Sequence, residues 1–239
     1  SLQAYQVFAI GSAVDDPNEQ HELLKRAVEL DPDFVGAYSS LTTTCWTLGH
    51  CKEQRQFAQE AHGRSSKLPE RDRLLIDIDY LDATYDFDTE IDRLKQYQHL
   101  YPNESLTGNY LASIYLAQED LISAETYARA AYNLTYDANN LSMLRLSLAL
   151  QGKADEIERL AADFRARGGS EEGATMALLH VYQLRGDRER LEQGIRLLER
   201  KPGYLKRLAT YYRVKTLLAA GLLSRAHDAV VPAWRAARE

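Results

Sequence analysis

Turn signals recur along this chain at an almost constant spacing. A tight turn every 33 to 36 residues leaves room for two helices in each unit, and seven such units fill the 239 residues. Apolar residues spaced i, i+3 and i+4 between the turns favour helices over strands. The spacing predicts an all-α chain of about seven helical hairpins. The expected turns lie near residues 15, 49, 85, 119, 152, 186 and 221.

The junctions between units carry residues that end and start helices. Pro32 follows an apolar helical stretch, and a proline there cannot continue the helical hydrogen bonds. We expect Asp33 and, 70 residues further on, Asn103 to cap the next helices, because their side chains can accept bonds from free N–H groups. Asp16 followed by Pro17 predicts another helix start.

A period near 34 residues with two helices per unit is typical of the tetratricopeptide repeat, and this chain resembles that family over its whole length. The clearest unit covers residues 105–137. Two residues of the chain depart from the family pattern, namely Glu90, where a small residue is usual, and Tyr136, where proline is usual. The resemblance implies a right-handed α-solenoid in which residues 1–239 form one array. The matching positions are Leu111, Ala112, Tyr115, Ala124, Ala128 and Ala131.

A narrower resemblance rests on the stretches "SLQAYQVF", "LLKRAVELDPDFVGAY" and "LPERDRLLIDIDYLDATYDFDTEIDRLKQYQHLYPNE". They are similar to the repeat region at the C-terminal end of large bacterial signalling proteins that carry a Ser/Thr kinase, an adenylate cyclase or a winged-helix regulator. This implies a regulatory scaffold that acts by protein contacts. Because the chain starts at Ser1 and stops within a helical pattern, we expect it to be part of a longer protein. The sequence does not fix the location of this segment, which is either in the cytoplasm or on the outer side of a membrane that anchors the parent protein.

The tetratricopeptide resemblance also implies a concave groove, lined by the first helix of each hairpin. Asp79, Asp82 and Asp86 are spaced i, i+3 and i+7, so we expect them on one helical face. They form either an acidic patch for a basic partner segment or cation, or a solvated helix face. We expect a protein or peptide partner that is neutral to basic. The residues placed in the groove are Tyr5, Thr43, Trp46, Asp79, Asp82, Asp86, Asn109, Ser113, His180, Tyr211 and Lys215.

The charge distribution limits the partners further. The net charge of −6 argues against nucleic acid, because phosphate contacts need a basic surface. Residues 1–120 carry a net charge of −11 and residues 121–239 one of +5. This asymmetry predicts a homo-oligomer that forms head to tail or as an antiparallel pair, unless the charges lie on outer faces without a partner. No apolar run has the length of a membrane span, so we expect no direct membrane insertion.

Motifs for catalysis or metal binding are weak in this sequence. Cys45, His50, Cys51 and His62 have the residue types of a zinc site, but about eleven helical residues place His62 roughly 16 Å from the turn. The stretch "HELLK" at residues 21–25 lacks the second histidine of the zinc-protease pattern. We therefore expect a buried Cys45, an exposed His50 and Cys51, no metal, no cofactor and no enzyme activity.

The expected function is that of a scaffold or regulatory module that binds a partner segment in its groove. Two alternatives remain open from the sequence. The chain is either a sensory domain that binds a small molecule between hairpins, or an oligomerisation arm of its parent protein.

Overall fold

A computed structural model describes residues 1–14, 16–201 and 203–236, without the side chains at 51, 203, 204 and 232–236. Within this part the chain is all-α, with fourteen α-helices and no strand, as the spacing of the turns predicts. The chain divides into two compact units, unit 1 (Ser1–Asn103) and unit 2 (Glu104–Glu239). In both units an odd-numbered first helix pairs with the even-numbered second helix that follows it.

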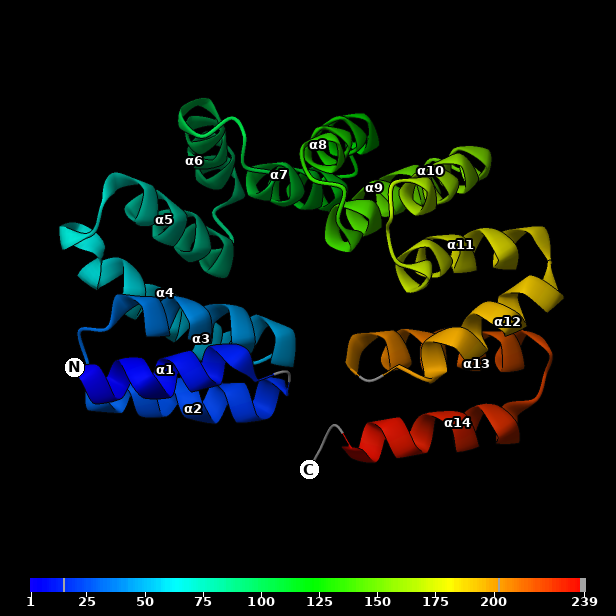
Figure 1. Cartoon of the computed structure of the whole chain (residues 1–239), viewed down its shortest axis with the longest axis horizontal. Coiled ribbons are helices and arrows are strands. Elements are labelled where there is room, and N and C mark those ends of the chain that lie inside the picture. The colour runs from blue at the N-terminus through cyan, green and yellow to red at the C-terminus, as the bar shows by residue number, and fades with distance from the viewer. Residues whose placement is uncertain (15, 202, 237–239) are drawn as a thin grey trace. The chain divides into compact units, whose positions relative to one another are not determined.

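Unit 1 contains three hairpins, α1–α2, α3–α4 and α5–α6, and Figure 1 shows the two helices of the first hairpin side by side. A short 3-10 helix lies between the second and third hairpins. The bounds are α1 Leu2–Ala13, α2 Pro17–Leu30, α3 Val35–Leu48, α4 Cys51–Arg64, η1 Ser65–Lys67, α5 Glu70–Thr84 and α6 Phe87–Leu100.

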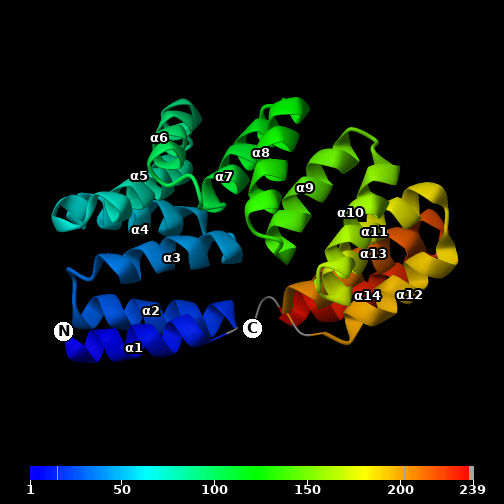
Figure 2. The same cartoon turned by 45° about the horizontal axis from the view of Figure 1, so that its top comes forward.

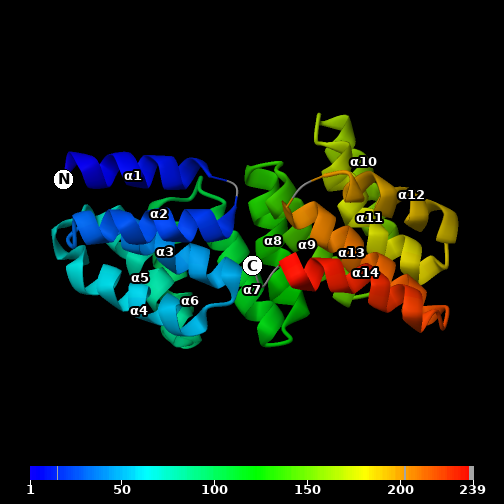
Figure 3. The same ribbon diagram turned by 90° about the horizontal axis from the view of Figure 1, so that it is seen from below.

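Unit 2 contains four hairpins (Figure 2), and the last of them, α13–α14, is clearest in Figure 3. Its largest core cluster runs through α7, α8, α9, α10 and α11. No helix among the described residues is both long and apolar enough to cross a bilayer. The bounds are α7 Leu106–Ala117, α8 Leu121–Leu134, α9 Ala138–Leu150, α10 Ala154–Ala166, α11 Glu171–Arg185, α12 Arg188–Glu199, α13 Gly203–Ala219 and α14 Leu223–Ala236.

The turns inside the hairpins share one backbone conformation. In the α3–α4 turn, the N–H groups of Gly49 and His50 donate to the carbonyls of Trp46 and Cys45 at 3.1 and 2.8 Å, which satisfies the last carbonyls of α3. Residue 15, where the first turn is expected, lies outside the described residues. One residue with φ between 61° and 75° marks each of the other turns, namely Gly49, Tyr85, Glu119, Gly152, Gly186 and Gly221.

The helix starts agree only partly with the sequence. Asp16 caps α2 as expected, because its side chain accepts a 2.8 Å bond from the N–H of Asn18. The expected caps at Asp33 and Asn103 are wrong. Four residues separate α2 from α3 and five separate α6 from α7, so α3 starts after Phe34 and α7 after Ser105, in both cases without a side-chain cap.

One position on the second helices, five residues after each turn residue, is buried in both units. Its exposed fraction is 8% or less in every described hairpin that has a marked turn. This is the position at which Glu90 departs from the family pattern. The residues there are Gln54 and Glu90 in unit 1, and Ala124, Ile157, Leu191 and Ala226 in unit 2.

Candidate functional site

A row of residues on the first helices stays accessible in each unit. It lies six residues before each turn residue, and none of its members is buried. Neighbouring first helices contact one another, α3 with α5 in unit 1 and α7 with α9 and α9 with α11 in unit 2. The row therefore continues from one hairpin to the next within a unit. Its members are Thr43 and Asp79 in unit 1, and Ser113, Leu146, His180 and Lys215 in unit 2.

Exposed aromatic side chains accompany this row in unit 1. Trp46 lies three residues after Thr43 on α3 and is 68% exposed, and Tyr5 on α1 is 60% exposed. The Tyr5 ring contacts those of Phe8 and Phe34 at centroid distances of 6.4 and 6.5 Å. An exposed tryptophan leaves a large apolar surface in water, and burying it against a partner would be favourable.

Three carboxyl groups interact in the third hairpin of unit 1. Asp79 accepts a 3.2 Å hydrogen bond from the Ser39 hydroxyl on α3, and burial raises the pKa of Asp82. Glu90 on α6 is completely buried, and neither of its carboxyl oxygens has a hydrogen-bond partner. Burial, followed by the negative charges of Asp82 and Asp79, raises the pKa of Glu90 to about 8. The cluster thus holds a proton at neutral pH.

Asp86 does not share the helical face of Asp79 and Asp82. Helix α5 ends at Thr84, and Tyr85 turns the chain with a φ of 62°. Asp86 is the N-cap of α6, where its side chain accepts a 3.4 Å bond from the N–H of Thr89. The i, i+7 spacing that grouped the three aspartates assumes an unbroken helix, and the turn at Tyr85 breaks it.

In unit 2 the predicted Asn109 joins two first helices. Its side-chain amide donates to the carboxamide oxygen of Asn140, a buried residue on α9. The amide of Asn140 also donates to the carbonyl of Thr135, at 2.9 Å. Asn109 thus contributes to the packing of α7 on α9, whereas the predicted Ser113, one turn further along α7, is exposed.

The other predicted residues of unit 2 lie beside basic groups. Burial, followed by the charges of Arg145 and Lys215, lowers the pKa of His180 on α11. The Nζ atom of Lys215 lies 5.4 Å from the centre of the Tyr211 ring, and Tyr211 is 55% exposed. Arg145 on α9 is absent from the predicted set because it lies one residue before the row position. The accessible side of unit 2 is therefore basic where that of unit 1 is acidic.

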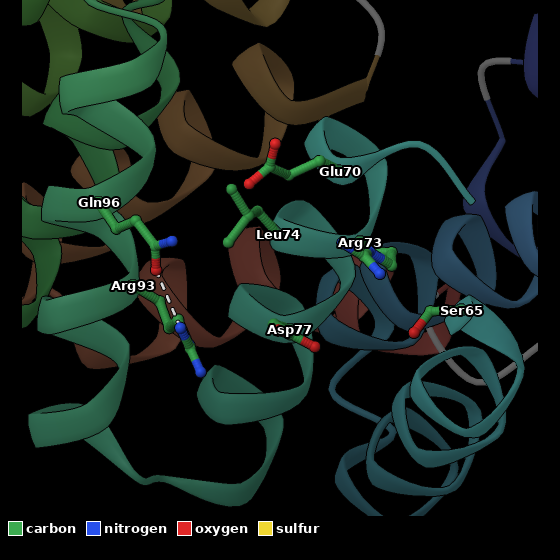
Figure 4. Close-up of a pocket in the computed structure, with 7 residues that line it drawn as sticks. All are labelled: Ser65, Glu70, Arg73, Leu74, Asp77, Arg93 and Gln96. Atoms are coloured by element: carbon green, nitrogen blue, oxygen red, sulfur yellow. Dashed lines mark hydrogen bonds between the residues drawn. The ribbon is translucent and has the colours of Figure 1, made fainter. Parts of the chain in front are cut away.

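A pocket of about 260 Å³ opens between η1, α5 and α6 (Figure 4). Arg93 in its wall donates a 2.9 Å hydrogen bond to Gln96. Small-molecule sites are usually about 300–1,000 Å³ and mostly apolar, so this charged pocket gives little support to a sensory site. It is lined by Ser65, Glu70, Arg73, Leu74, Asp77, Arg93 and Gln96.

Of the residues that suggested a zinc site, His62 lies apart as expected and the Cys51 side chain is outside the described part, whereas Cys45 and His50 come together with two others. Cys45 is fully buried, and burial, with a smaller contribution from Glu53, raises the pKa of its thiol to about 11. The ring of His62 stacks on Tyr80, away from the turn at the start of α4. The ligand-type residues near Cys45 are His21, His50 and Glu53, and no sequence motif unites them.

Comparison with known proteins supplies the fold and no closer relationship. No family model matches the chain, and no curated protein matches it. Among solved structures, a tetratricopeptide repeat protein from Parabacteroides merdae superposes with a TM-score of 0.63 at 14% identity, over 98% of this chain and 93% of the other. The fold is that of tetratricopeptide repeat proteins.

Two further structures of this kind support that statement. A tetratricopeptide repeat protein from Thermus thermophilus, TTC0263, gives a TM-score of 0.54 at 18% identity, over 74% of this chain and 96% of the other. A chain of the APC/C hetero-tetramer Cut9-Hcn1 gives 0.59 at 15% identity, over 93% of this chain and 42% of the other.

Proposed function

We propose that this chain is a protein-interaction module that holds a neutral-to-basic segment of a partner along the first helices of unit 1. The tetratricopeptide fold supports an interaction role, and one structural neighbour is a chain of the APC/C hetero-tetramer Cut9-Hcn1. The proposed contacts in unit 1 are Tyr5, Thr43, Trp46, Asp79 and Asp82. Asn109 and Asp86 have structural partners of their own and contribute to packing and capping.

The single observation that carries this proposal is the exposed Trp46 on α3, next to a helix that presents Asp79 and Asp82. The tryptophan offers an apolar anchor, and anchors of this type dominate binding energy at interfaces. The two aspartates add negative charge, which attracts Lys and Arg and repels acidic segments. Together these groups favour a partner segment with an apolar residue flanked by basic ones.

The proposal is tested with two fluorescent peptides that share their apolar residues and differ only in carrying Lys or Glu at the flanking positions. We expect the basic peptide to bind and the acidic one to bind at least about tenfold more weakly. Trp46→Ala should weaken binding by about thirtyfold, the effect of losing an interface anchor. Asp79→Asn combined with Asp82→Asn should weaken it by about tenfold and reduce its salt dependence.

Matched controls remove the same chemistry elsewhere in unit 1. Leu100→Ala shortens another exposed apolar side chain, and Asp92→Asn removes a charge from the exposed side of α6. Both should leave peptide binding unchanged. Equal binding of the acidic and basic peptides, or equal losses in the controls, would show that unit 1 does not select its partner in this way.

We further propose, from the narrower resemblance, that the chain is a regulatory arm of a larger bacterial signalling protein. The support is the resemblance of three stretches of unit 1, quoted in the sequence analysis, to such proteins. Sequencing the native reading frame on both sides of residues 1–239 tests this directly. A kinase, cyclase or DNA-binding domain in the same frame agrees with the proposal, and a frame without any of them contradicts it.

The charge difference between the units favours one second function, self-association. The accessible side of unit 1 presents Asp79 and Asp82, and that of unit 2 presents Arg145 and Lys215. We propose that these surfaces attract each other between copies of the chain. Light scattering should then show a dimer or larger species at low salt that dissociates at high salt. A monomer under both conditions would rule this out.

A further inference from the structure

Four metal-binding side chains converge where the first two hairpins of unit 1 meet. His21 belongs to α2, Cys45 to the last turn of α3, His50 caps α4, and Glu53 lies in the first turn of α4. Their ligand atoms all lie within 4.8 Å of one another. We propose that His21, Cys45, His50 and Glu53 form a tetrahedral site for zinc or a chemically similar divalent metal ion, which joins α2, α3 and α4.

The distances between the donor atoms suit a common metal ion. Zinc lies about 2.0–2.3 Å from nitrogen, oxygen and sulfur ligands, which places the donors of a tetrahedral site roughly 3.3–3.8 Å apart. Nε2 of His21 lies 3.4 Å from Oε2 of Glu53, and Nδ1 of His50 lies 3.3 Å from the same oxygen. The rings of His21 and His50 meet edge to face, with their centroids 5.7 Å apart. Both histidines therefore direct a ring nitrogen at one carboxylate.

A buried, unsatisfied nitrogen supports the site independently. His21 is only 6% exposed, and its Nε2 atom has no hydrogen-bond partner despite its closeness to Glu53. A polar atom buried without a partner costs free energy, and coordination to a metal ion would satisfy it. On the other side of the ring, Nδ1 lies 3.5 Å from a carboxylate oxygen of Glu22. This pairing of a carboxylate with a ligand histidine commonly orients the ring at metal sites.

The charges of the ligands balance those of a divalent ion. On binding, the Cys45 thiol loses its proton to the solvent and a metal–thiolate bond forms. One thiolate, one carboxylate and two neutral histidines then neutralise the two positive charges. The nearby Lys25 adds positive charge, but its Nζ atom lies 3.8 Å from Glu22. A site with four protein ligands and no free position is a structural one.

A mixture of one thiolate, two imidazoles and one carboxylate favours zinc. Calcium and magnesium require oxygen ligands, whereas tetrahedral sulfur and nitrogen sites bind zinc. The side chains of His50 and Glu53 are 46% and 43% exposed, so both can adjust by the small distance that coordination requires. Cys45 and His21 are held by the core, which gives the site two fixed ligands and two adaptable ones.

Cobalt(II) titration of the untagged, chelator-treated chain tests the proposal. The other cysteine, Cys51, is first replaced by serine, so that Cys45 is the only thiol. We expect a cobalt–thiolate absorption band that saturates at one equivalent and is displaced by zinc. Zinc should also raise the thermal midpoint of unfolding as its concentration increases. The band should disappear in Cys45→Ala and weaken strongly in His50→Ala and Glu53→Gln.

Two further variants separate coordination from a general effect on the fold. Glu22→Gln should weaken metal affinity by about 10–100-fold, as expected for a residue that orients a ligand. His62→Ala removes a histidine from the far end of α4 and should leave the titration unchanged. Because His50 and Glu53 are partly exposed, their variants are expected to keep the helical circular dichroism of the parent. No band, a band that survives Cys45→Ala, or an equal loss in His62→Ala would overturn the proposal.

Discussion

The two units fill the same buried position with opposite chemistry. Five residues after each turn residue, unit 1 has Gln54 and Glu90, whereas unit 2 has only apolar residues, among them Ala124 and Ile157. The backbone is a helical hairpin in both units, and the position is buried in both. The repeat thus decides which positions are buried, and the side chain at each position decides how burial changes the free energy of folding.

The same contrast extends to the charge of each unit. Residues 1–103 carry 10 Lys and Arg against 18 Asp and Glu, a net charge of −8, while residues 104–239 carry 19 against 17, a net charge of +2. Unit 1 keeps part of its negative charge half-buried, at Asp79 and Asp82, and places the carboxyl group of Glu90 completely out of water beside them. These carboxyl groups lower the stability of unit 1 next to the surface that we propose for binding, and such local destabilisation is common at functional sites.

The largest effect is expected when the buried carboxyl group is transferred to unit 2. Ala124→Glu places a carboxyl group where a methyl group is fully buried, and it should lower the free energy of unfolding by about 4 kcal/mol at pH 8. Ala130→Glu, at an exposed position of the same helix, should change it by less than about 0.5 kcal/mol. Urea denaturation measures both. A cost below about 1 kcal/mol for Ala124→Glu would remove the distinction between the units.

A glycine in each unit tests how closely the helices of a hairpin pack. A Cβ atom at Gly108 in α7 would lie 2.8 Å from Cβ of Ala131 and 2.9 Å from the carbonyl oxygen of Tyr127. Gly108→Ala should therefore destabilise the chain by about 2 kcal/mol. Gly63 in α4 has nothing near its missing Cβ, so Gly63→Ala should stabilise the chain by up to about 1 kcal/mol. The same sign for both variants would contradict this.

The pH dependence of stability should distinguish unit 1 from unit 2. The pKa of Glu90 is about 8 in the folded chain, above its ordinary 4.5, so folding favours the protonated form. Its contribution is complete below pH 4.5 and is lost as the pH rises towards 8, by up to about 1.4 kcal/mol per pH unit. Glu90→Gln should remove this slope and become increasingly stabilising relative to the parent across that range.

The control for this measurement is Asp92→Asn, which removes a carboxylate from an exposed position of the same helix. Its difference from the parent should stay nearly constant between pH 5 and 8. If the free energy of unfolding of Glu90→Gln changes with pH in the same way as that of the parent, the Glu90 carboxyl group is not the source of the pH dependence.

The smallest effect is expected at the turns. Glu119 holds a φ of 61° that glycine adopts without strain, so Glu119→Gly should stabilise the chain by roughly 0.5–1 kcal/mol. Gly49→Ala should destabilise the α3–α4 turn by a similar amount, because Gly49 has a φ of 75°. Thermal unfolding of the two variants measures both changes, and destabilisation by Glu119→Gly would show that its side chain holds the turn.

Sequence reasoning located the hairpins because their signals are local. A turn residue and the apolar spacing on either side of it lie within a few residues of one another, and glycine marks four of the turns in the sequence, at Gly49, Gly152, Gly186 and Gly221. The turns at Tyr85 and Glu119 have no glycine, and the stretches around them, which fit the same period, indicate them instead. The helix caps were less predictable, since the short turns that precede α3 and α7 move their starts past Asp33 and Asn103.

The sequence by itself determined the all-α class and the pairing of helices, because both follow from the helical period and the spacing of the turns. Only the tertiary structure decided the pKa of the Glu90 carboxyl group and which side chains lie near Cys45. The pKa of Glu90 depends on how completely α5 and α6 exclude water from it. His21 and Cys45 are separated by 24 residues along the chain, and only the packing of α2 against α3 brings their side chains together.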